Sequence, residues 1–262
     1  MSDIGAFAAP AKKSLGQHFL RDKNAVQKII GAIPAGADVL EIGPGPGALT
    51  TPLLQRVASL ALIEKDDGFA DHWQQLAQSE PRLCVIHADV MDALGDAVAK
   101  HRPQWIAGNL PYNISGPLTA SLASLPNIEG MVLMYQREVG ERIMAQPGSR
   151  QYGGLSVLVQ HHYRAMRLLT LPPGAFAPPP RVHSVVVKLI AHGNSPPCTF
   201  AELQRAVRQG FAHRRKTIAN NFRRDLSDED WLHLGVDPKS RPETLNYDAW
   251  TRIALKLGRS KP

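Results

Sequence analysis

The sequence predicts an α/β protein, in which a domain built on a parallel β-sheet precedes a small all-helical domain. From about residue 38 to residue 190, short apolar segments of strand length alternate with longer amphipathic segments of helix length. Strands that alternate with helices form parallel sheets covered by helices on both faces. A Gly/Asn/Ser/Pro-rich segment at 192–197 then marks a boundary, so we expect the first domain at 1–194 and the second at 195–262.

The strands of the first domain are expected in its short apolar runs. They are Asp38–Ile42, Leu60–Glu64, Arg82–Ile86, Gln104–Ala107 and Gly130–Met134, with helices such as Leu49–Val57 and Asp67–Gln78 between them. Two later strands are expected at Arg164–Leu171 and His183–Ile190. The proline-rich segment 172–180 between them excludes a central strand or a helix and predicts a stiff loop.

The second domain is predicted to consist of helices. Thr199 and Glu202 form a capping-box pattern that opens a helix through about His213. A second helix is expected over Lys216–Arg224, and Asn246 caps a last one. One face of that last helix carries the apolar residues Trp250, Ile253 and Leu257.

Positive charge is concentrated at the two ends of the chain. The 262 residues hold 30 Lys and Arg against 23 Asp and Glu, a net charge of +7. Residues 199–262 hold 13 basic against 8 acidic side chains, and the first 30 residues hold 5 against 2. Such basic ends either attract a polyanion or are solvated helix faces, and charge alone does not decide between them.

Several protein classes are excluded. No apolar run approaches the ~20 residues of a membrane-spanning helix. The first ten residues, Met1–Pro10, lack the basic and apolar stretches of a secretory signal. Cys84 and Cys198 stand far apart, outside any C-x-x-C pattern, which argues against a disulfide scaffold or a zinc cluster. We therefore expect a cytoplasmic protein with no membrane contact and no bound metal.

A glycine-rich loop follows the first predicted strand, in the segment Glu41–Gly47. Gly43 and Gly45 let the backbone turn sharply and approach a ligand closely. Glu64 ends the second strand, where a carboxylate can accept hydrogen bonds from both ribose hydroxyls of an adenosine. Asp89 follows the third strand and can accept one from an adenine amino group. A tight turn with two helix caps is the alternative, and acids after two successive strands disfavour it.

The spacing of the glycines favours one adenosine cofactor over another. Dinucleotide-binding loops usually read G-x-G-x-x-G and place a pyrophosphate at a helix N-terminus. Here the spacing is G-x-G-x-G, and no phosphate-clamping Lys or Arg lies near it in the sequence. S-adenosylmethionine has no phosphates. The sequence therefore predicts this methyl donor as the cofactor.

Asn109-Leu110-Pro111-Tyr112 follows the fourth strand and predicts the site of methyl transfer, and Asn109 is also expected to contact the cofactor. An adenine amine is a poor nucleophile because its lone pair is delocalised into the ring. The Asn109 amide oxygen and the Leu110 carbonyl can accept from both N–H groups and draw that pair back. Tyr112 offers a face for a splayed base to stack on, worth ~1–3 kcal/mol. An Asn-x-Pro turn with a core tyrosine is the alternative.

Phe176, in the proline-rich loop, is a candidate second wall against a flipped base, or equally a core residue. Adjacent residues cannot share a helix face, so we expect His161 and His162 at a solvated helix end and not at a metal. Trp73, Trp231 and Trp250 lie within helical patterns and are predicted to be core or domain-contact residues.

Four segments together resemble the small-subunit (16S) ribosomal RNA adenine dimethyltransferases of the KsgA/RsmA type. They are Lys13–Leu20, Glu41–Gly45, Asn109–Ile114 and Phe176–Val182, in family order across nearly the whole chain. The resemblance implies a Rossmann-like class I S-adenosylmethionine-dependent methyltransferase whose N-terminal segment, 12–30, covers the cofactor. It also implies that His18 and Leu20 contact the cofactor. Many family members carry Asn where this chain has His18.

The resemblance also implies a substrate. The family converts two adjacent adenosines near the 3′ end of 16S ribosomal RNA to N6,N6-dimethyladenosine, late in assembly of the small subunit. The partner would be this RNA within the immature subunit, bound by a monomer. The helical domain would engage the particle through its basic residues, which include Arg208, Arg214, Arg215, Lys216, Arg223 and Arg224.

Three other functions stay open from the sequence alone. One is methylation of a 23S ribosomal RNA adenine, which the long basic C-terminal segment disfavours. Another is a non-catalytic ribosome assembly factor, which intact Asn109 and Tyr112 disfavour. The last is a nicotinamide oxidoreductase, which the glycine spacing and the missing phosphate-binding cation disfavour.

Overall fold

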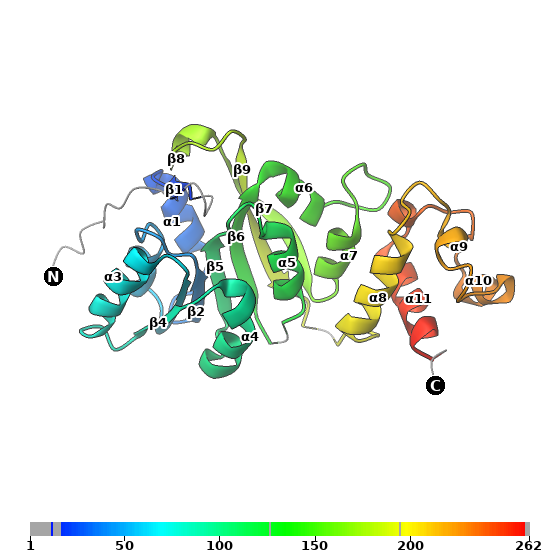
Figure 1. Ribbon diagram of the computed structural model, residues 1–262, viewed down its shortest axis with the longest axis horizontal. Coiled ribbons are helices and arrows are strands. Elements are labelled where there is room, and N and C mark those ends of the chain that lie inside the picture. The colour runs from blue at the N-terminus through cyan, green and yellow to red at the C-terminus, as the bar shows by residue number, and fades with distance from the viewer. Residues whose placement is uncertain (1–11, 13–16, 126, 194, 260–262) are drawn as a thin grey trace. The chain divides into compact units, whose positions relative to one another are not determined.

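A computed structural model describes residue 12 and residues 17–125, 127–193 and 195–259 (Figure 1). The segment Met1–Pro10 and residues 13–16 of the N-terminal motif lie outside the described residues, as does Asn194 of the predicted linker. The chain forms two compact units. Unit 1 comprises 1–118, 127–140 and 166–190, and unit 2 comprises 119–126, 141–165 and 191–262. The predicted boundary at 194/195 therefore lies close to residue 191, where the last segment of unit 2 begins. Two earlier segments, 119–126 and 141–165, also belong to that unit.

A seven-stranded sheet organises the described strands. In spatial order they are β4 (Leu83–His87), β3 (Ser59–Glu64), β2 (Asp38–Ile42), β5 (Trp105–Asn109), β6 (Gly130–Gln136), β9 (Ser184–Ala191) and β7 (Tyr163–Leu171). Strands β2 to β6 pair in parallel, and β9 runs antiparallel to β6. The chain moves outward from β2 to β4 and then returns to β5 on the other side of β2. Ligands of such sheets bind at this reversal, beyond the carboxyl ends of the strands.

Helices follow the strands of unit 1 as the alternating pattern predicts. The helices that precede β7 in the sequence are α1 (Lys23–Gly31), α2 (Thr50–Leu54), α3 (Asp67–Ala77), α4 (Val90–His101), α5 (Ser115–Ala123), α6 (Arg137–Ile143) and α7 (Gly154–Gln160), the last of which belongs to unit 2. Helix α2 is shorter than the predicted Leu49–Val57. The Arg56 amide bonds the Leu53 carbonyl at 2.8 Å, a tight last turn that redirects the chain toward β3.

Trp73 on α3 packs against the glycine-rich loop. Its side chain is 1% exposed, which confirms the prediction of a core residue. The indole Nε1–H donates to the Gly45 carbonyl at 2.9 Å. A Cβ at Gly47, where φ is +92°, would lie 2.5 Å from the Trp73 ring. Only glycine therefore fits at this position of the loop.

The N-terminal segment and the proline-rich loop pair to form a short two-stranded sheet, β1–β8, called the strap below. Strand β1 (Phe19–Leu20) pairs antiparallel with β8 (Phe176–Ala177), and Leu20 is opposite Phe176. The loop also contains the 3₁₀ turn Pro173–Ala175. As predicted, its prolines keep it out of the central sheet, but two of its residues form this separate edge pair.

Unit 2 contains the predicted C-terminal helices and one that the sequence analysis missed. They are α8 (Phe200–Gly210), α9 (Ile218–Asn221), α10 (Asp228–Leu234), the 3₁₀ turn Pro242–Thr244 and α11 (Tyr247–Arg259). The capping box of Thr199 and Glu202 is present, which confirms the start of α8. The predicted helix over Lys216–Arg224 is wrong in length, because Thr217 caps a helix that ends at Asn221. Ser227 and Asp230 form the capping box that opens α10 and was a usable signal.

The core of unit 2 is built around Trp250. This side chain is fully buried with Phe222 and Trp231, so both tryptophan predictions are confirmed here. A Cβ on Gly210 of α8 would lie 2.4 Å from the Trp250 ring. Glycine at this position therefore lets α8 and α11 pack side by side, as Figure 1 shows.

The expected solvated position of His161 is wrong. Its side chain is 3% exposed, its Nδ1 lies 3.0 Å from the Tyr247 hydroxyl, and the Phe200 ring is 5.7 Å away. Burial, and to a lesser extent the nearby charge of His162, lower the pKa of His161 to about 4. The imidazole is therefore neutral at physiological pH.

The buried His161 makes unit 2 sensitive to acid. The folded pKa lies below the unfolded value of about 6.5, so the unfolded chain gains a proton first as the pH falls. Stability from this group is complete above pH 6.5 and decreases toward pH 4, by up to about 3 kcal/mol. We expect urea melts to show this loss in wild type and in the exposed variant His213→Gln, but a smaller loss in His161→Gln. Equal losses in all three proteins would contradict it.

Candidate active site

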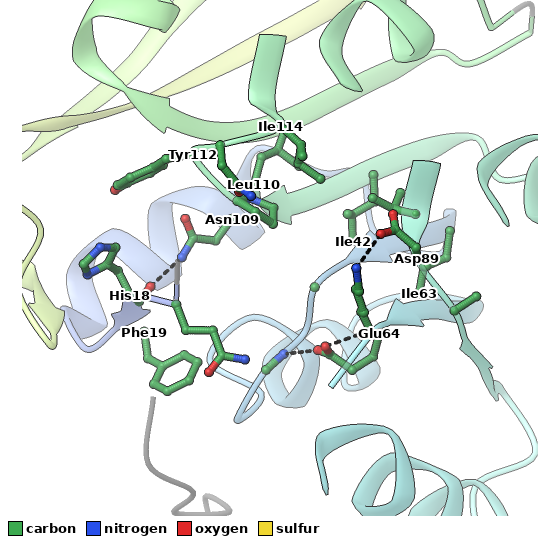
Figure 2. Close-up of a pocket in the computed structure, with 18 residues that line it drawn as sticks. His18, Phe19, Ile42, Ile63, Glu64, Asp89, Asn109, Leu110, Tyr112 and Ile114 are labelled. Carbon is green, nitrogen blue, oxygen red and sulfur yellow. Dashed lines mark hydrogen bonds and ion pairs between the residues drawn. The ribbon is translucent and has the colours of Figure 1, made fainter. Parts of the chain in front are cut away.

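A cavity of about 180 Å³ lies beyond the carboxyl ends of β2, β3, β4 and β5 (Figure 2). All of its lining belongs to unit 1. Of the predicted site residues, it brings together His18, Gly43, Gly45, Glu64, Asp89, Asn109, Leu110 and Tyr112. Parallel strands end at one edge of a sheet, which explains why residues so far apart in sequence meet here.

Glu64 holds the glycine-rich loop in place. One carboxyl oxygen accepts from the Gly45 amide at 3.0 Å. The other accepts from the amides of Lys65 at 2.9 Å and Asp66 at 2.8 Å. Burial raises the pKa of Glu64, and these three N–H groups favour its ionised form. A carboxyl group has about four acceptor sites, so Glu64 also retains capacity for a ribose hydroxyl.

Substitution of Glu64 is expected to weaken donor binding about 10- to 100-fold, the range of a charge-assisted hydrogen bond. Glu64→Gln keeps the size of the side chain but replaces one acceptor oxygen by an amino group. Calorimetric titration with S-adenosylmethionine measures the effect. Asp67→Asn, the same change on an exposed neighbour, is the control. Equal affinities in both variants would remove Glu64 from the ribose site.

Lys65 is a cavity residue that the sequence analysis missed. Its ammonium pairs with Asp89 Oδ2 at 2.8 Å, and the other oxygen of Asp89 accepts from the Met91 amide at 2.8 Å. The Lys65 bond, followed by the Met91 bond, lowers the pKa of Asp89. Asp89 therefore caps α4 and is ionised, and an adenine amine must share it with Lys65. A lysine directly after a strand-end acid was a signal for this pair.

Asn109 is oriented by the N-terminal segment. Its Nδ2–H donates to the His18 carbonyl at 2.7 Å, as Figure 2 shows. This bond fixes the amide so that its oxygen faces away from the His18 carbonyl and is free to act as an acceptor. His18 is held in turn because its Nδ1 lies 2.8 Å from the Pro178 carbonyl.

The rest of the tetrapeptide is anchored to the sheet. The Leu110 amide donates to the Met134 carbonyl at 3.2 Å. The Tyr112 hydroxyl lies 2.8 Å from the Ser184 hydroxyl, and its ring stacks on the His18 ring at 5.5 Å. Burial raises the pKa of Tyr112, while the Ser184 hydroxyl lowers it in part. Tyr112 is therefore a neutral, positioned aromatic wall of the cavity.

Phe176 and Leu20 do not line this cavity. Phe176 is 4% exposed and belongs to the core of unit 1, where it is opposite Leu20 in the β1–β8 pair. The structure thus places Phe176 in the core position that the sequence left open. Leu20 lines a smaller neighbouring cavity. Contacts of these two side chains with base or cofactor stay predictions.

The cavity fits S-adenosylmethionine. Gly43 and Gly45 have φ of +64° and +51°, and a Cβ on Gly45 would press on the Phe19 ring at 3.2 Å. Two carboxylates, Glu64 at the end of β3 and Asp89 after β4, supply acceptors for an adenosine.

Within the described part of the chain, no group of three His, Cys, Asp or Glu side chains could hold a metal ion. No described helix is long and apolar enough to cross a membrane.

A sequence model of the family described as "Ribosomal RNA adenine dimethylase" matches residues 8–258. The chain belongs to this family. Two relatives named "Ribosomal RNA small subunit methyltransferase A", from Laribacter hongkongensis and Nitrosococcus oceani, are each 43% identical over 255 residues. The alignments cover 94% of this chain and 96% and 97% of the relatives. The resemblance inferred from the four sequence segments is thereby confirmed.

Solved structures agree with this placement. A dimethyladenosine transferase from Plasmodium falciparum has a TM-score of 0.80 and 26% identity, covering 92% of this chain and 98% of its own. The 23S rRNA methyltransferase ErmE has a TM-score of 0.68 and 22% identity, covering 92% and 99%, and so shows the fold alone. The Rossmann-like methyltransferase fold is confirmed. This member of the adenine dimethylases is an S-adenosylmethionine-dependent ribosomal RNA methyltransferase.

Proposed function

We propose that this chain methylates N6 of two adjacent adenosines near the 3′ end of 16S ribosomal RNA, giving N6,N6-dimethyladenosine. Its substrate is the RNA within an immature small subunit, late in assembly, and it acts as a cytoplasmic monomer. The orientation of the Asn109 amide beside Leu110 and Tyr112 carries the proposal. Family membership and the names of the relatives support the substrate class.

The residues of the cavity perform the chemistry mainly by positioning. The donor supplies an electrophilic methyl group on a positively charged sulfur. The Asn109 oxygen and the Leu110 carbonyl accept hydrogen bonds from the adenine amine, which raises electron density on N6. Tyr112 holds the base by stacking, at ~1–3 kcal/mol. The amine becomes acidic after methylation, so its proton leaves to solvent without a strong general base.

The cavity and the basic C-terminal segment suit two different tasks in binding unstacked RNA. The base must leave its stack to reach the acceptors of Asn109 and Leu110 in the cavity, and single-stranded or loop RNA permits this at a few kcal/mol. The helical C-terminal segment supplies basic side chains for phosphates. Phosphate contacts would position the enzyme, and the cavity would select the base.

Incubation with labelled S-adenosylmethionine and immature small subunits, followed by nucleoside mass analysis, tests the proposal. We expect label in N6,N6-dimethyladenosine from 16S RNA. Label in 23S RNA from large subunits would support the rival methyltransferase. Binding to the small subunit without any label would support a non-catalytic assembly factor. Either result would contradict the proposed function.

A further inference from the structure

The mechanism above gives the target base one aromatic wall, the ring of Tyr112. A single wall leaves the other face of an extruded base in contact with water. Phe176, the second wall that the sequence suggested, is buried in the core of unit 1. Among the described residues that line the cavity, the side chains with aromatic rings are His18, Phe19 and Tyr112. A second wall within the cavity must therefore come from His18 or Phe19.

The His18 ring faces the Tyr112 ring, whereas the Phe19 ring packs elsewhere. The centroids of the His18 and Tyr112 rings are 5.5 Å apart and their planes differ by 27°, which is a stacked arrangement. Phe19 instead meets the edge of the Phe69 ring and lies against Gly45 of the glycine-rich loop. Phe69 belongs to the core of unit 1. His18 is therefore the aromatic neighbour that shares the cavity with Tyr112.

The acceptor for the adenine amine lies next to these two rings. The Asn109 Nδ2–H donates to the backbone carbonyl of His18 at 2.7 Å, so the two residues are held together. Figure 2 shows the His18 and Tyr112 rings on the same side of the Asn109 amide. An adenine whose amine reaches the Asn109 oxygen is therefore bordered by both rings.

A base between the two rings requires a small movement of His18. Two stacked contacts of 3.5–4.0 Å each place the outer rings about 7–8 Å apart, so the separation of 5.5 Å must widen by roughly 2 Å. Tyr112 is held by the Ser184 hydroxyl at 2.8 Å. The His18 side chain is half-buried, and its Nδ1 lies 2.8 Å from the Pro178 carbonyl. The ring can therefore rotate outward while the His18 backbone stays bonded to Asn109.

We propose that His18 is the second wall of the target-base site, so that the adenine is held between the His18 and Tyr112 rings with its amine on Asn109. The contact between the two rings is exchanged for two base contacts, one on each face, which offsets the cost of extruding the base. The His18 ring thus serves the RNA substrate, whereas the family resemblance implies a contact with the donor. The inference rests on the proposed methylation of adenine and adds a residue that recognises the base.

The test compares two His18 variants in methylation of immature small subunits with labelled S-adenosylmethionine. His18→Asn removes the aromatic face but keeps a side-chain N–H for the Pro178 carbonyl and the backbone carbonyl for Asn109. We expect its kcat/KM for the subunit to fall about 5- to 150-fold, the usual loss of one base–aromatic stack. Donor affinity, measured by calorimetry, should stay unchanged. His18→Phe restores an aromatic face without the N–H and should recover most of kcat/KM.

His233→Asn, the same change at an exposed position of α10, is the control for the substitution. A wild-type kcat/KM in His18→Asn would overturn the proposal, and so would an inactive His18→Phe whose melting temperature is that of wild type. A loss of donor affinity in His18→Asn as large as its loss of kcat/KM would assign the ring to the donor and also overturn it. Absence of labelled N6,N6-dimethyladenosine with the wild-type protein would instead contradict the proposed function itself.

Discussion

Replacing Asn109 with alanine is expected to lower kcat for methyl transfer by about 10²–10³-fold, the usual cost of one preorganised catalytic hydrogen bond. The substitution removes the acceptor that raises electron density on the adenine amine. It also removes the Nδ2–H that holds the His18 carbonyl at 2.7 Å, so the strap loosens. The carboxylates around the donor remain, and donor affinity should fall by less than about tenfold.

Single-turnover rates with immature subunits measure the loss, and calorimetry measures donor affinity. Asn109→Asp keeps acceptor oxygens but places one against the His18 carbonyl, so it should separate catalysis from strap anchoring. Asn24→Ala, at an exposed position of α1, controls for the substitution type. A wild-type rate in Asn109→Ala would refute the assigned role. An equal loss of donor affinity and rate would reassign Asn109 to donor binding.

The sequence predicted the layout of the active site because one rule of topology covers it. Carboxyl ends of parallel strands meet at one edge, so Gly43, Glu64, Asp89 and Asn109 had to lie together once their strands were found. What these side chains bind within the protein could not be predicted. Glu64 accepts from three backbone amides, a pattern that depends on the path of the glycine-rich loop and not on its composition.

Burial decided the residues that the sequence left open or placed wrongly. Phe176 lies in the proline-rich loop, whose sequence is compatible with a wall against the base and with a core residue. The pairing of β1 with β8 places its side chain in the core. His161 was expected at a solvated helix end, yet Phe200 and Tyr247, which are distant from it in the sequence, cover it. Helix and strand periods report one element's own faces, whereas these positions depend on what packs over them.

Unit 2 contains a basic cavity of about 450 Å³, lined by the end of α8, by α9 and by the segment that follows α9. Its cationic lining residues are Lys216, Arg223 and Arg224, with His213 beside them. Arg214, which the sequence analysis grouped with them, is bound elsewhere. Its guanidinium donates to the Arg150 carbonyl at 2.8 Å and to the Tyr152 carbonyl at 2.9 Å. The structure therefore separates a structural arginine from side chains that are available to phosphate.

Charge reversal at Lys216, Arg223 and Arg224 together is expected to weaken binding of 16S RNA by roughly 10²–10³-fold near 0.1 M salt, if each contacts one phosphate. The slope of log K against log salt should become less steep by about 2–3. Filter binding across a salt series measures both quantities. Arg214→Ala should lower the melting temperature of the protein and leave the salt slope of RNA binding unchanged. Lys100→Glu, at an exposed position of α4, should change neither the melting temperature nor the salt slope. An unaltered slope in the triple variant would show that this cavity does not bind phosphate, because release of counterions accompanies every such contact.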